Sequence, residues 1–95
     1  MNAAIVEAEF IVRNELGLHA RPAGRFVSIA GRFRSEISVY RAGEWVSGLS
    51  VLSLLSLAAT HGTRLRVRAV GDDAEAAVAV LGRLIESPDD ATMPA

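Results

Sequence analysis

A histidine and an arginine, His19 and Arg21, stand where an apolar stretch gives way to an amphipathic one. Residues 5–12 are almost wholly apolar or β-branched, which is typical of a strand. Residues 23–30 place apolar side chains at helical spacing, and Pro22 suits a first helical turn because no N–H is needed there. His19 is therefore predicted to lie at or just before the N-terminus of a helix.

This position favours a negatively charged group. The first amides of a helix have no acceptor within the helix, and the helix dipole adds a partial positive charge. An imidazole there is poorly placed to become a cation and well placed to carry a phosphoryl group. Arg21 is also poorly placed as a cation, so its charge makes most sense if an anion arrives beside it. A capping histidine and an ordinary surface arginine are the simpler alternatives.

The motif Gly17-Leu18-His19-Ala20-Arg21-Pro22-Ala23 resembles the active-site signature of HPr, the histidine phosphocarrier of the bacterial phosphotransferase system. The resemblance runs without an obvious gap over residues 5–85. It includes Ser50-Val51-Leu52 and the turns at Gly62 and Gly71. A motif together with a matching order of elements is a more specific signal than the motif alone.

The resemblance implies a phosphoryl carrier and not an enzyme. His19 would accept the phosphoryl group on Nδ1 from phosphorylated enzyme I, with phosphoenolpyruvate as the ultimate donor, and pass it to EIIA-type acceptors. Arg21 and the backbone amides of Ala20 and Arg21 would bind the group. Neither a cofactor nor a metal is expected. Residues 14–17 and 50–55 look more like NPr, the nitrogen-branch relative, than like the sugar-transport branch.

Ser50 has two interpretations. It is a natural N-cap for a short helix predicted over residues 51–58. In the HPr family it is also the regulatory position in bacteria that possess HPr kinase/phosphorylase, which would then be a further partner. The cap is favoured here, because Leu49 precedes the serine where regulated proteins often have a basic residue.

The predicted helix over residues 51–58 is apolar on all sides. Leu54 and Leu57 are expected to enter the core, which would leave some of three other residues exposed: Val51, Leu52 and Leu55. Exposed apolar side chains beside a reactive histidine suggest a docking patch, and HPr proteins are expected to bind partners there. A mostly buried short helix is the alternative.

The pattern predicts an α+β protein of order βαββαβα, an open-faced β-sandwich whose four-stranded antiparallel sheet carries three helices on one face. Residues 1–88 form a single domain in this prediction, and residues 89–95 form a flexible tail. Strands are predicted at residues 5–12, 36–40, 44–47 and 63–70, and helices at 20–31, 51–58 and 74–86. The turn at Gly71-Asp72-Asp73 is expected to cap the last helix.

Composition excludes several classes. The chain has no cysteine and only two histidines, so a metal site is not expected. The formal net charge of -1 argues against nucleic acid, and the stripe of Arg64, Arg66 and Arg68 is read as a solvated sheet face without stacking aromatics. No stretch resembles a membrane span or a signal peptide, so a cytoplasmic protein is expected. The protein is also expected to be a monomer.

Two other functions stay open. A regulatory or binding domain of the same fold would dock with partners without phosphotransfer, although the retained His19 argues against that loss. A sheet-face nucleic-acid binder rests only on the arginine stripe.

Overall fold

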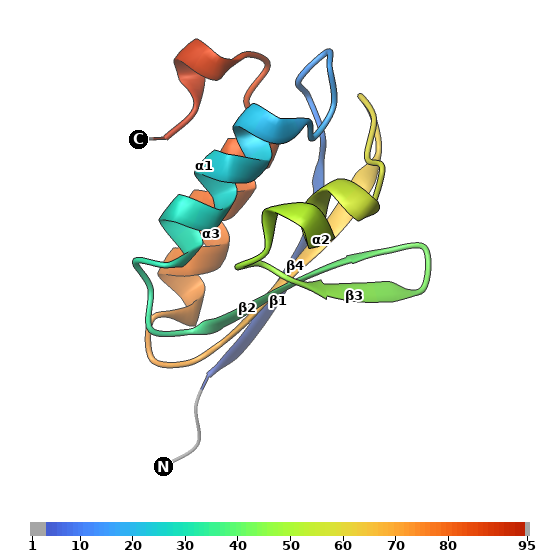
Figure 1. Cartoon of the computed structure of the whole chain (residues 1–95). Helices are drawn as coiled ribbons and strands as arrows, with labels where there is room; N and C mark the ends of the chain where they lie inside the picture. Colours follow the sequence, from blue (N-terminus) through green and yellow to red (C-terminus); the bar gives the residue numbers. More distant parts are fainter. Residues whose placement is uncertain (1–3, 95) are drawn as a thin grey trace.

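The computed structural model describes residues 4–94, in which one sheet is covered on a single face by helices (Figure 1). The elements in chain order are β1 (Ile5–Ile11), α1 (Ala20–Ala30), β2 (Glu36–Arg41), β3 (Glu44–Ser47), α2 (Val51–Ser56), β4 (Arg64–Val70), α3 (Ala74–Ile85) and the 3₁₀ helix η1 (Asp90–Thr92). The strands pair antiparallel in the order β1-β4-β2-β3. The predicted open-faced β-sandwich is confirmed. Within the described residues, no helix combines the length and apolarity needed to cross a bilayer.

The strand β4 shows how the sequence alternation fixes the two faces of the sheet. Three of its side chains face the helices and have no solvent exposure: Leu65, Val67 and Ala69. On the opposite face, two arginines of β4 lie across from glutamates of β1. Arg66 Nη2 lies 3.2 Å from Oε2 of Glu9 on β1, and Arg68 Nε lies 3.7 Å from Oε1 of Glu7. Two of the three arginines of the stripe are therefore paired with glutamates of β1.

Aromatic side chains do lie beside that stripe, which the sequence analysis did not expect. The Arg66 guanidinium stands 5.8 Å from the ring centroid of Tyr40, and Tyr40 packs 5.0 Å from Trp45. Tyr40 pairs directly with Trp45 on β3 and with Arg66 on β4, so both rings share the open face with the arginines. The glutamates of β1 offset two of the three arginines on this face, Arg66 and Arg68.

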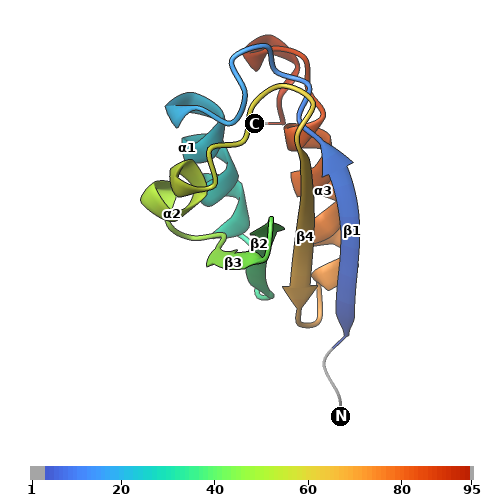
Figure 2. The ribbon, with the colours of Figure 1, turned by 90° about the vertical axis from the view of Figure 1, so that its right-hand side faces the viewer.

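The helices form the core with the inner face of the sheet. The largest fully buried side chains of the core include residues from all three helices and two strands: Phe26, Leu54, Leu81, Leu84, Leu65, Val67 and Val39. Helix α2 ends at Ser56, earlier than predicted, because Ala58 adopts a φ of 50° that no α-helix can continue through. Figure 2 shows the loop from β1 to α1, the loop into β4 and η1 at the same end of the molecule.

Asp73 lies at the start of α3 but does not cap that helix with its side chain, contrary to the prediction. Its carboxylate instead accepts hydrogen bonds from Ser35 Oγ at 2.6 Å, Arg34 N at 2.8 Å and Ser35 N at 3.0 Å. The Ser35 hydroxyl and then the Arg34 amide hold the pKa of Asp73 below its ordinary value of 3.8. Asp73 therefore ties the loop after α1 to the turn after β4.

Replacing Asp73 with alanine is expected to lower the melting temperature at neutral pH, because two backbone amides and a buried hydroxyl lose their acceptor. Since the folded pKa lies below the unfolded value of 3.8, the stabilisation is present above that pH and disappears as the pH falls through the folded pKa. Thermal melts at several pH values measure this difference. Asp72→Ala, at an exposed neighbour, is the control. Equal melting temperatures for both variants at pH 7 would contradict the assignment.

Candidate functional site

His19 is the residue immediately before α1, as the sequence predicts. Its backbone is extended, with φ −82° and ψ −172°, and its side chain does not cap the helix. The imidazole is half-buried, and its Nε2 atom is fully buried with no hydrogen-bond partner. Because a reacting phosphorus atom needs open space around the attacking nitrogen, the burial of Nε2 disfavours attack by that nitrogen.

The loop before His19 is clamped to the segment between α2 and β4. Leu18 is buried and its amide donates to the carbonyl of Ala59 at 2.9 Å. Gly17 has φ 72°, and a Cβ at this position would overlap the carbonyl oxygen of Ala59. The amide of Gly17 also donates to the carbonyl of Asn14 at 2.9 Å. Only glycine fits this turn, and the turn sets where the histidine lies.

The first turn of α1 offers backbone donors beside the histidine. In the first hydrogen bond of the helix, the amide of Ala23 donates to the carbonyl of His19 at 3.0 Å. Ala20 and Arg21 precede that bond, so their amides have no acceptor within the helix. Pro22, the third residue, is buried and has no N–H to satisfy. Acidic side chains are absent from this turn, so nothing there competes with an incoming anion for the amides.

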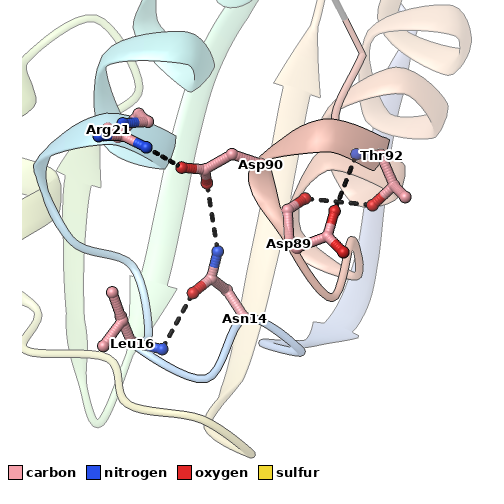
Figure 3. Close-up of polar contacts among 6 residues, drawn as sticks. All are labelled: Asn14, Leu16, Arg21, Asp89, Asp90 and Thr92. Atoms are coloured by element: carbon pink, nitrogen blue, oxygen red, sulfur yellow. Dashed lines mark hydrogen bonds and ion pairs between the residues drawn. The ribbon is translucent and has the colours of Figure 1, made fainter.

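Arg21 does not point freely toward solvent. Its Nη1 atom lies 2.7 Å from Oδ2 of Asp90, although the arginine side chain is 69% exposed (Figure 3). Asn14 reaches the same aspartate, with Nδ2 at 3.4 Å from Oδ1. The guanidinium that the sequence assigns to phosphate binding is thus held by a carboxylate of the C-terminal segment.

The C-terminal segment, for which a flexible tail over residues 89–95 is predicted, makes specific contacts where the structure describes it. The chain beyond α3 turns back and forms η1 within residues 89–94, while Ala95 lies outside the described residues. Asp89 accepts a hydrogen bond from the amide of Thr92 at 3.1 Å, and Met93 is only 8% exposed. An aspartate three residues before a threonine, followed by a methionine, is a cap and an apolar anchor. That signal was present in the sequence and was missed.

An open depression surrounds His19. It is lined by residues from the β1–α1 loop, the turn before β4 and the C-terminal segment: Arg13, Asn14, Glu15, Leu16, His61, Pro88, Asp89 and Asp90. His61, the second of the two histidines in the sequence, therefore shares this depression with the candidate phosphoryl acceptor. Among the described residues, no cluster of side chains is suited to holding a metal ion.

Of the three residues of α2 proposed for a docking patch, the structure exposes one. Leu54 and Leu57 are buried, as predicted, and Val51 and Leu55 pack partly against the core. Leu52 alone of the three candidates is exposed, at 80%. Two further apolar side chains that the sequence analysis did not single out are also exposed: Leu16 at 75% and Leu49 at 58%.

Ser50 caps α2 as predicted. Its Oγ accepts a hydrogen bond from the amide of Ser53 at 3.1 Å, and its backbone is extended. This contact satisfies one of the free amides of a short helix and accounts for the serine without any modification.

Comparison with known proteins assigns the arrangement to a family. The family described as the PTS HPr component phosphorylation site matches residues 6–87. This chain belongs to the HPr family. The phosphocarrier protein HPr of Borreliella burgdorferi is 41% identical over 83 residues, which cover 87% of this chain and 96% of that protein.

Two further matches extend the comparison. A multiphosphoryl transfer protein of Salmonella typhimurium is 42% identical over 84 residues, which cover 85% of this chain but only 22% of that protein. The chain therefore spans about a fifth of that relative's length. The crystal structure of HPr from Bacillus anthracis superposes with a TM-score of 0.83 at 34% identity, covering 86% of this chain and 98% of that one. Sequence and fold thus agree on the family.

Proposed function

We propose that this protein is a phosphocarrier of the phosphotransferase system. It accepts a phosphoryl group on Nδ1 of His19 from phosphorylated enzyme I and passes it to EIIA-type acceptors. The observation that carries the proposal is the placement of His19: it precedes α1, and its Nε2 is buried without a partner. Membership of a family defined by a phosphorylation site supports the same conclusion.

The transfer needs only a nucleophile and a place for negative charge. The lone pair of Nδ1 forms a new bond to phosphorus, while the bond from phosphorus to the donor breaks and returns its electron pair to the donor. A phosphoryl group brings roughly −1.5 to −2 charge. The amides of Ala20 and Arg21 and the Arg21 guanidinium are the groups of this chain that can bind it.

The chemistry of a phosphorylated histidine suits a carrier. A nitrogen–phosphorus bond is labile, so the group can be handed on, and the protein returns to its starting state only after a second partner has taken it. We therefore propose a carrier and not an enzyme that acts on a free substrate. His19 and Arg21 lie on one chain with the helix end, so transfer needs no second copy of the protein. We propose the cytoplasm as the place of action.

Replacing His19 with alanine is expected to abolish labelling by phosphoenolpyruvate and enzyme I while the protein stays folded. His61→Ala is the matched control, because it is the only other histidine and lines the same depression. Acid-labile phosphate measured on the intact protein gives the answer. Labelling of His19→Ala at the parental level would refute the proposal. A parent that takes no phosphate under these conditions would favour a docking domain without phosphotransfer.

We also propose that partners dock beside His19 on the apolar surface centred on Leu52. Helix α1 packs against α2, so the two helices form one continuous surface next to the site. Val51 and Leu55 support this surface from positions that are partly buried. Regulatory phosphorylation of Ser50 by a kinase would remove the cap of α2 and so alter the same surface, which is a separate hypothesis.

Leu52→Glu is expected to weaken binding to enzyme I or to an EIIA-type acceptor about tenfold, since burying one leucine is worth about 1.5–3 kcal/mol. Its melting temperature should stay close to the parent's, because the side chain is 80% exposed. Ile5→Glu makes the same chemical change at a residue that is 61% exposed on β1, whose beginning lies at the opposite end of the sheet, and should bind normally. Calorimetric titration measures both affinities. Parental affinity for a folded Leu52→Glu variant would place the docking surface elsewhere.

A further inference from the structure

Arg21, Asp90 and Asn14 form a chain of polar contacts that joins the first turn of α1 to η1 (Figure 3). Arg21 Nη1 lies 2.7 Å from Oδ2 of Asp90, within the range of a charge-assisted hydrogen bond. The second carboxylate oxygen contacts Nδ2 of Asn14 at 3.4 Å. Asn14 Oδ1 in turn accepts the amide N–H of Leu16 at 2.9 Å. Both oxygens of Asp90 are therefore engaged beside the site.

The aspartate is presented by an anchored segment. Met93 packs into the core, and the Asp89 carboxylate accepts the amide of Thr92. Ser87 Oγ donates to the carbonyl of Arg83 at 2.7 Å and so fixes the exit from α3. The Asp90 side chain is 25% exposed, whereas the Arg21 side chain is 69% exposed. The carboxylate is thus the fixed partner, and the long arginine side chain is the one free to turn.

We propose that Asp90 is a positioning residue that competes with the phosphoryl group for Arg21. The inference rests on the proposed function. Before transfer, the ion pair stabilises the unphosphorylated protein. After transfer, the phosphoryl group draws the guanidinium toward His19, and the carboxylate of Asp90 is left as a nearby negative charge.

The loss of the ion pair and the repulsion between Asp90 and the phosphoryl group act in the same direction. Each makes the phosphorylated protein less stable relative to the unphosphorylated one, so Asp90 raises the tendency of His19 to give its phosphoryl group away. Asn14 takes part by contacting the same carboxylate from the loop that leads to the histidine. Asp90 lies beyond residues 6–87, so the family match does not include it.

A competition experiment measures this directly. Parent protein labelled with ¹⁵N is mixed with an equal amount of unlabelled Asp90→Asn, catalytic enzyme I and enough phosphoenolpyruvate for less than half of the total. Because both proteins exchange the group through enzyme I, intact-mass spectra report their relative affinity for it. Asp90→Asn is expected to favour the phosphorylated form roughly two- to fivefold over the parent, the range for a partly exposed ion pair. A ratio of one would overturn the inference.

Three further variants separate competition from a structural role. Asp72→Asn removes the same charge at the far end of the sheet and should give a ratio of one. Asp90→Glu restores the charge and should return the ratio toward the parent's. In an Arg21→Ala background the effect of Asp90→Asn on the ratio should be markedly smaller, because the two side chains act through each other. An effect of Asp90→Asn that is undiminished without Arg21 would contradict the proposed competition.

Binding of inorganic phosphate supplies a readout that does not depend on phosphotransfer. Amide resonances of Ala20 and Arg21 are followed while phosphate is added to unphosphorylated protein. Asp90→Asn is expected to bind phosphate more tightly than the parent or Asp72→Asn. Equal binding by all three proteins would overturn the role of Asp90, even if enzyme I labels His19. Conversely, tighter binding by Asp90→Asn in a protein that enzyme I never labels would support the competition and refute the proposed function.

Discussion

The free amides at the N-terminus of α1 are the feature on which the rest of the site depends. They favour negative charge at one point of the surface, and the chain before the helix delivers an imidazole to that point. Leu18 is buried and bonded to Ala59, and Gly17 packs against the same carbonyl. The segment between α2 and β4 therefore fixes the position of the histidine, although that residue lies at the end of a loop.

The charges around this point make sense as parts of a cycle. An arginine in a first helical turn is disfavoured by about 0.3–1 kcal/mol through the dipole, and here a carboxylate from η1 offsets that cost. A phosphoryl group would be the stronger partner, because it carries more charge and also meets the helix amides. In the unphosphorylated carrier Arg21 would pair with Asp90, and in the phosphorylated carrier the phosphoryl group would compete with Asp90 for it. Both states would then be accessible, as a group that is accepted and later released requires.

The sequence predicted the sheet and helices well because their patterns are local. Leu65, Val67 and Ala69 alternate strictly, and Ser50 stands at the position where a helix cap belongs. The placement of His19 followed from a strand, a proline and a helix in succession. Exposure around α2 was harder to predict, since a helix apolar on all sides does not reveal which residues meet the core.

Contacts between distant parts of the chain escaped the sequence analysis. Asp73 looked like a cap for its own helix, yet it bonds Ser35 across the molecule. Asp90 looked like part of a tail, yet Met93 anchors that segment and brings the carboxylate to Arg21. In each case a local signal competed with a tertiary partner about 40 to 70 residues away, which no short pattern encodes.

We propose that Nδ1 of His19 carries the phosphoryl group, because Nε2 is buried. Nitrogen-resolved NMR of the two imidazole rings, recorded on ¹⁵N-labelled protein before and after reaction with phosphoenolpyruvate and enzyme I, tests it most directly. We expect coupling to phosphorus and a changed resonance at Nδ1 of His19, with the His61 ring unmodified. Phosphorus bonded to Nε2 of His19, or to either nitrogen of His61, would contradict it.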